Sequence, residues 1–164
     1  RMSDHSAAPL PLNDVTTFGD ARHAADASTP GGHITCLDFI AEAPAPAPSR
    51  PRPAVTRVLS ADGANHIVFT FLPGQTLPDH KAAHPITVQV LRGAVTFGCE
   101  GTDYPLTPGR AVHLPAYLPH SVTAPGELND NADALDPTEE PTVMLLTMHT
   151  GAQVSAASRA ADKS

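Results

Sequence analysis

From residue 74 the sequence runs Gly74-Gln-Thr-Leu-Pro-Asp-His80-Lys-Ala-Ala-His84, continues through Ile86-Thr-Val-Gln-Val-Leu91 and ends at Arg92-Gly93. A second stretch runs Gly109-Arg-Ala-Val-His113-Leu-Pro115-Ala-Tyr-Leu-Pro-His120-Ser-Val122. In both stretches a histidine is framed by glycine and proline, the residues that most often form turns. The two stretches therefore predict turn-bounded units of similar design, each of which presents a histidine.

The rest of the chain from residue 55 onward indicates short strands separated by turns. The predicted strands are rich in β-branched and aromatic residues, and they are Val55–Leu59, His66–Leu72, Ile86–Leu91, Ala94–Cys99, Tyr104–Leu106, Arg110–Leu114, His120–Ala124 and Thr142–His149. Ser60–Asn65 forms a hairpin-like turn cluster, and Arg92-Gly93 forms a tight turn. No window shows helical periodicity. This pattern predicts an all-β sandwich or barrel.

The paired spacing resembles the cupin signature, whose halves are G-x5-H-x-H-x3-E-x6-G and G-x5-P-x-G-x2-H-x3-N. The residues that fall on these patterns are Gly74, His80, Gly93, Gly109, Pro115 and His120. The chain thus resembles a small single-domain cupin of the RmlC-like superfamily, of the cupin 2 conserved-barrel type, with a degenerate first motif. The resemblance implies a jelly-roll barrel (a double-stranded β-helix).

Four positions depart from the family pattern. Ala82 stands at the second histidine and Ile86 at the glutamate, while Tyr117 replaces the glycine and Ala124 the asparagine. Two of the four metal ligands that the resemblance implies are therefore missing from their usual places.

His84 is the residue that we expect to replace the missing histidine. On a straight strand His80 and His84 would be about 13 Å apart, so a bulge between them is needed before both can reach one ion. We predict that His80, His84 and His120 bind a divalent transition metal (Fe, Zn, Mn, Ni or Cu). Gln89 and His113 are candidate pocket residues. Gln89 is a weak, neutral ligand at best, and His113 could face either side of its strand.

Composition divides the chain into a core and irregular flanks. The 164 residues include 18 prolines and 11 glycines, which is enough chain for one domain. We expect a largely flexible N-terminal segment over residues 1–42, with a possible strand at 33–40, followed by a proline-rich linker at 43–53. The barrel then covers residues 54–149 and includes an acidic loop at 125–141. A disordered tail follows at 150–164. The proline-rich segment could instead be a ligand for a partner domain.

Charge and cysteine content limit the partners that we expect. A net charge of −7 argues against binding to nucleic acid or to an anionic membrane. Two cysteines are too few for a disulfide framework, and they favour a cytoplasmic location. The resemblance to small cupins implies a homodimer, to which residues 33–40 could contribute an edge strand.

Three functions are consistent with these features. The first is a metal-dependent enzyme, dioxygenase- or isomerase-like, that acts on a small molecule; the second is a non-catalytic cupin that binds or senses a small ligand without metal. The third is an interaction scaffold that uses the proline-rich and acidic segments. No catalytic residue is assigned, because Cys99 has no histidine nearby in sequence and no serine occupies a nucleophile elbow.

Overall fold

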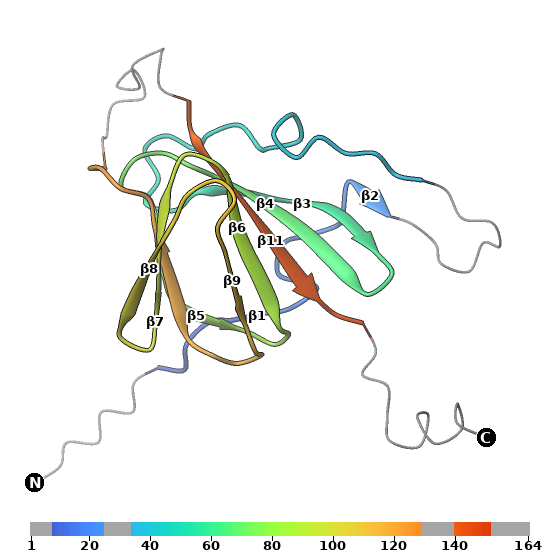
Figure 1. Ribbon diagram of the computed structural model, residues 1–164. Helices are drawn as coiled ribbons and strands as arrows, with labels where there is room; N and C mark the ends of the chain where they lie inside the picture. Colours follow the sequence, from blue (N-terminus) through green and yellow to red (C-terminus); the bar gives the residue numbers. More distant parts are fainter. Residues whose placement is uncertain (1–7, 25–33, 129–139, 152–164) are drawn as a thin grey trace, which may run out of the picture.

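Two β-sheets form the architecture (Figure 1). The computed structural model describes residues 8–24, 34–128 and 140–151. One sheet has the order β1-β5-β10-β7-β8 and contains β1 (Leu12–Asn13), β5 (Thr76–Ala82), β10 (His120–Thr123), β7 (Val95–Cys99) and β8 (Thr102–Leu106). The other has the order β2-β3-β4-β11-β6-β9 and contains β2 (His23–Ala24), β3 (Ala54–Ala61), β4 (Ala64–Phe71), β11 (Thr142–His149), β6 (Ile86–Arg92) and β9 (Ala111–Leu114). The predicted all-β class is confirmed.

The main core lies between the two sheets. Alternate side chains of the strands point inward, so that Met144, Leu146 and Met148 of β11 pack with Phe97 of β7 and Val122 of β10. The intervening residues of β11 face the opposite side, where a second cluster contains Val58, Val68, Val143 and Leu145. β11 is therefore buried on both faces, which explains its nearly continuous apolar sequence.

The turn at Gly93 changes sheet. β6 belongs to the six-stranded sheet and β7 to the five-stranded sheet, so the tight turn predicted at Arg92-Gly93 carries the chain from one layer to the other. Gly93 has a φ of +83°, and a Cβ at this position would collide with the side chain of Thr142. Glycine is required here by the backbone angle and also by the close approach of β11.

The sequence patterns did not predict β5, the strand that carries His80. Pro78 lies within β5, and proline cannot donate a hydrogen bond to a neighbouring strand. The pairing of β5 with β10 is irregular near this proline: His120 lies opposite His80, but Val122 lies opposite Leu77. The extra residue on β5 is a β-bulge.

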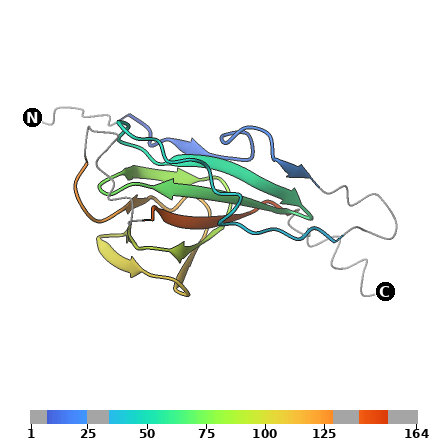
Figure 2. The ribbon, with the colours of Figure 1, turned by 90° about the horizontal axis from the view of Figure 1, so that it is seen from above.

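The N-terminal residues that the structure describes are ordered against both sheets, in contrast to the flexible segment predicted there. β1 adds to the edge of β5 and β2 to the edge of β3, both in parallel, and the two strands lie along one side of the molecule (Figure 2). Phe18, between them, packs against the core and meets Phe69 edge to face at 5.9 Å. The segment is held because it partly buries this aromatic ring against the core.

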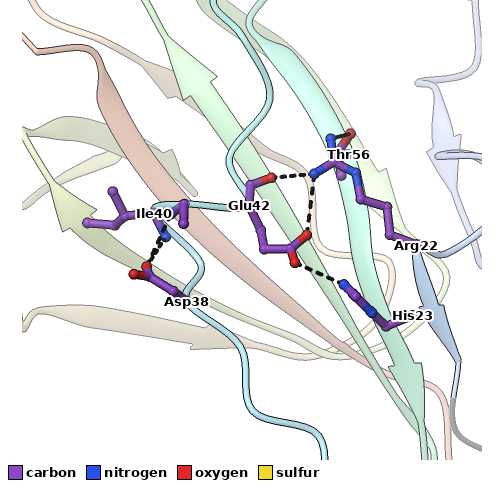
Figure 3. Close-up of polar contacts among 7 residues, drawn as sticks. Arg22, His23, Asp38, Ile40, Glu42 and Thr56 are labelled. Carbon is purple, nitrogen blue, oxygen red and sulfur yellow. Dashed lines mark hydrogen bonds and ion pairs between the residues drawn. The ribbon is translucent and has the colours of Figure 1, made fainter.

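Residues 34–50 form no strand, so the strand predicted over 33–40 is not present in its described part. Leu37, Phe39 and Ala43 instead pack on the second cluster, on the outer face of the six-stranded sheet. Glu42 anchors this segment, since its carboxylate contacts Arg22 at 3.4 Å and His23 at 2.9 Å (Figure 3).

The proline-rich segment is docked on the domain and is not a free spacer. Thr70 donates a hydrogen bond to the Pro44 carbonyl, and buried Gln75 donates to the carbonyls of Ala47 and Arg50. Prolines lack N–H groups but keep their carbonyls as acceptors, which is why side-chain donors hold this segment.

Several predictions fall outside the described residues: those for residues 1–7 and 25–33, for the centre of the acidic loop at 129–139, and for the tail from residue 152. Among the residues that are described, no helix is long and apolar enough to cross a membrane.

Candidate functional site

His80 and His120 face each other on neighbouring strands of the five-stranded sheet. They are direct partners in the pairing of β5 with β10, and their ring centroids are 4.2 Å apart with an interplanar angle of 63°. Both side chains belong to the buried polar residues, at 8% and 2% exposure. The two framed histidines of the sequence therefore form one buried pair.

Backbone carbonyls fix the orientation of both rings in the same way. Nδ1 of His80 lies 2.8 Å from the Pro78 carbonyl oxygen, and Nδ1 of His120 lies 2.9 Å from that of Leu118. A carbonyl can only accept, so Nδ1 carries the proton and donates in each neutral ring. Each Nε2 is then an acceptor, and among the described residues neither Nε2 has a hydrogen-bond partner.

Burial keeps the pair uncharged at neutral pH. It is the main cause that lowers the pKa of His120 from 6.5 to about 4, a shift to which the nearby His80 also contributes. Burial also lowers the pKa of His80. The site thus offers two neutral imidazoles with free lone pairs.

The surroundings of the pair are largely apolar. Phe97 stacks on His120 with centroids 5.2 Å apart and an interplanar angle of 11°. Ala82 and Ile86, at the two positions where the family pattern has metal ligands, are buried in the main core. Neither side chain can bind a metal, so these positions contribute packing only.

Cys99 is a neighbour of the pair that the sequence did not reveal. It has no histidine nearby in the chain, but the pairing of β7 with β10 places it directly opposite His120. Its thiol donates to the Pro119 carbonyl at 3.4 Å. Burial, and then Glu100, raise the pKa of this thiol, so it is not an activated nucleophile.

His84 does not join the pair. β5 ends at Ala82, and His84 lies in the following turn, near enough to Asp14 to contribute weakly to that residue's lowered pKa, which is set first by hydrogen bonds from Thr16. Within the described part of the chain, no three His, Cys, Asp or Glu side chains are placed to hold one metal ion. The structure thus brings together two of the three predicted ligands, because the chain turns away after β5.

Gln89 lies on the opposite side of the six-stranded sheet from the main core. It pairs with Leu145 of the second cluster, whereas its neighbours Val88 and Val90 are in the main core. The strand alternation that makes these two valines core residues therefore excludes Gln89 from the interior. It is not a pocket residue beside His80 and His120.

His113 lies at the margin of a cavity between β7, β8 and β9. The cavity has a volume of about 250 Å³ and is lined by Phe97, Cys99, Glu100, Tyr104, Val112, His113, Leu114, Pro115 and Leu118. Nδ1 of His113 is 2.8 Å from the Thr87 hydroxyl oxygen. Phe97 contacts both this cavity and the His120 ring, so the cavity adjoins the histidine pair.

Comparisons with known proteins agree with this architecture. Residues 67–129 match the family model described as the cupin domain, while no curated protein gives a significant sequence match. A conserved protein of unknown function from Streptococcus pyogenes is 19% identical with a TM-score of 0.53, covering 74% of this chain and 91% of its own. KdgF from a Halomonas species is 20% identical with a TM-score of 0.51, covering 70% and 94%.

A candidate mannose-6-phosphate isomerase from Ralstonia eutropha JMP134 is 24% identical with a TM-score of 0.52, covering 73% of this chain and 100% of its own. At these sequence identities, the solved structures show only that this chain shares their fold. Together with the two-sheet architecture, the family match establishes that this chain contains a cupin domain, which includes both His80 and His120.

Proposed function

We propose that this protein is a cupin that binds a small molecule through His80 and His120, acting as a pair of neutral hydrogen-bond acceptors. The observation that carries the proposal is that both Nδ1 atoms are bonded to backbone carbonyls. Both Nε2 lone pairs are thereby left for a ligand. Burial, which lowers the pKa of each ring, keeps these lone pairs available at neutral pH.

The donor set does not fit a resident metal centre of the family type. Such a centre has four protein ligands, and this chain supplies imidazoles at two of the four positions. Ala82 and Ile86 occupy the others and are buried among apolar side chains. A divalent ion held by two neutral imidazoles alone would lack the three or more protein ligands that stable sites provide.

The chemistry of the pair favours ligands that donate hydrogen bonds. Two neighbouring acceptors suit two neighbouring donors, such as the hydroxyl groups of a vicinal diol or a sugar. Phe97 and the adjacent cavity provide an apolar surface for the carbon skeleton of the ligand. We therefore infer a small polyhydroxylated ligand.

A second candidate is the metal-dependent enzyme, which the ring orientation favours. Metal-binding histidines usually donate Nδ1 or Nε2 to a carbonyl or carboxylate and coordinate through the other nitrogen. His80 and His120 have this arrangement and would hold Fe, Zn, Mn, Ni or Cu through Nε2. When bound, such an ion would act as a Lewis acid toward a small molecule.

Metal analysis and ligand titration of the purified chain separate the two candidates. We expect no stoichiometric metal, together with saturable binding of vicinal diols such as erythritol or mannose that is lost in the His80→Ala, His120→Ala double variant. His84→Ala, which changes a histidine outside the pair, should bind normally. Stoichiometric metal that disappears in the double variant would overturn the metal-free proposal, and diol binding that survives in it would overturn the role of the pair.

A further inference from the structure

Arg57 is a buried cation whose charge has no partner in the described part of the chain. It lies on β3 directly opposite Ile67 of β4, a core residue, and it is only 9% exposed. Its Nε and Nη2 atoms are buried, and neither has a hydrogen-bond partner. Ion pairs among the described residues use Arg22, His23 and Arg92 with glutamates, and none involves Arg57.

An unpaired guanidinium in the interior is energetically unfavourable. Burial removes the hydration of Nε and Nη2, and folded proteins compensate for such burial with hydrogen bonds or a paired charge. The position is fixed by the backbone, since a register shift lies between Arg57 and Leu59 and Val58 faces the second cluster. The side chain therefore cannot turn to the outer face without disturbing the sheet.

The unpaired atoms define the shape of the missing partner. Nε–H and the adjacent Nη2–H lie on one edge of the planar guanidinium and point in parallel, which is the edge that binds a carboxylate through two hydrogen bonds. A carboxylate would satisfy both atoms and neutralise the charge.

Asn65 supplies a second unpaired atom on the same face. It lies two residues before Ile67 on β4 and is therefore a diagonal neighbour of Arg57. Its Nδ2 donates to Thr150, while its buried Oδ1 has no partner among the described residues. This oxygen requires a donor, which a bare carboxylate does not have.

We propose that Arg57 and Asn65 form a binding site for a small carboxylate that carries a hydroxyl or amino group on the adjacent carbon. Arg57 binds the carboxylate bidentately, and Asn65 accepts the hydrogen bond from the neighbouring group. The site is on the six-stranded sheet, whereas His80 and His120 are on the five-stranded sheet, so it is independent of the proposed function above.

The test is a titration of the full chain with glycolate, acetate and inorganic phosphate, followed through the NMR signal of the Arg57 Nε–H group and by calorimetry. Glycolate should shift this signal and bind more tightly than acetate or phosphate. Arg57→Met should weaken glycolate binding by about a hundredfold, and Asn65→Leu should reduce glycolate affinity to that of acetate. The control Arg92→Met removes an arginine that is paired with Glu140 and should bind glycolate normally.

Stability without ligand provides the second measurement. Because Arg57→Met removes an unpaired buried charge, we expect it to raise the midpoint of thermal unfolding. A lower midpoint would show that the guanidinium is already paired within the chain and would overturn the proposal. The proposal also fails if the wild type binds no glycolate, if phosphate binds as tightly as glycolate, or if Arg57→Met binds glycolate unchanged. Glycolate binding that persists in the His80→Ala, His120→Ala double variant separates this site from the histidine pair.

Discussion

His80 and His120 are direct partners across β5 and β10, with their ring centroids 4.2 Å apart and both Nδ1 atoms bonded to carbonyls two residues earlier in the chain. Two equivalent carbonyl contacts give both rings the same tautomer. The pair is thus organised by the backbone before any ligand binds, which lowers the cost of ordering these side chains on binding.

The buried histidines make stability depend on pH. Burial lowers the pKa of His120 from 6.5 to about 4, so between these values the unfolded chain binds more protons at this residue than the folded chain does. The free energy of unfolding should therefore decrease as the pH falls from 6.5 toward 4, by on the order of 3 kcal/mol. Urea denaturation at several pH values measures this slope. His120→Gln should reduce the slope, and equal slopes in the wild type and in His120→Gln would refute the assignment.

Tyr117 adopts a backbone conformation suited to glycine. Its φ is 67°, in the left-handed region that L-residues other than glycine, asparagine and aspartate rarely adopt. Its N–H donates to the Ala82 carbonyl at 2.7 Å, and its side chain is 58% exposed, so little packing is lost on truncation. Tyr117→Gly should stabilise the protein by about 0.5–1 kcal/mol in chemical denaturation. Tyr117→Ala keeps the Cβ and should give no such gain; equal effects of the two variants would argue against backbone strain.

Alanine substitutions at Gly93 and Gly101 separate two effects of adding a Cβ: strain of the backbone and steric collision with a neighbouring residue. Both have positive φ, but a Cβ on Gly93 would meet Thr142, whereas a Cβ on Gly101 would meet nothing within 4 Å. Gly101→Ala should therefore lower the free energy of unfolding by about 1 kcal/mol, because of backbone strain alone. Gly93→Ala should cost at least about 2 kcal/mol, since β11 must also shift. The comparison uses the free energies of unfolding of the two variants, and equal losses would contradict the close approach of β11 at Gly93.

Gln75 holds the proline-rich segment on the domain. It is 1% exposed, accepts from the Leu72 N–H through Oε1 and donates to two carbonyls of the segment through Nε2. Gln75→Leu keeps similar volume but leaves these groups unpaired, which should destabilise the protein by about 2 kcal/mol. Hydrogen exchange and proteolysis should then increase within residues 44–53. Thr76→Val, at a neighbouring position whose hydroxyl bonds to β10 instead, is the control and should leave this segment protected.

The strand pattern and the glycine and proline spacing were sufficient to predict the class of fold. Val88 and Val90 alternate with polar positions, and the strand predicted at Ile86–Leu91 is present as β6 with one further residue. The hairpin turn predicted between residues 60 and 65 is also present, with Asp62 and Gly63 both at positive φ. Local patterns suffice for such features because side-chain alternation and turn angles depend on neighbouring residues.

Residues distant in sequence were harder to place. Pro78 concealed β5, which exists because β10 and β1 pair with it on either side. His84 appeared to be a third ligand because it follows His80 closely, yet β5 ends between the two. The neighbour of His120 that no local pattern predicted is Cys99, which strand pairing brings opposite it.

The amino-acid sequence alone thus determined the all-β class and the two framed histidines, because turns and alternation depend on short stretches of chain. The tertiary structure alone decided that these two histidines meet, and that no third metal-ligating side chain of the described residues joins them. It also decided that the proline-rich segment docks on the sheet, and that Nε and Nη2 of Arg57 are buried with no hydrogen-bond partner in the described part of the chain. These features depend on which strands pair and in which register, and that choice minimises the free energy of the whole packed domain.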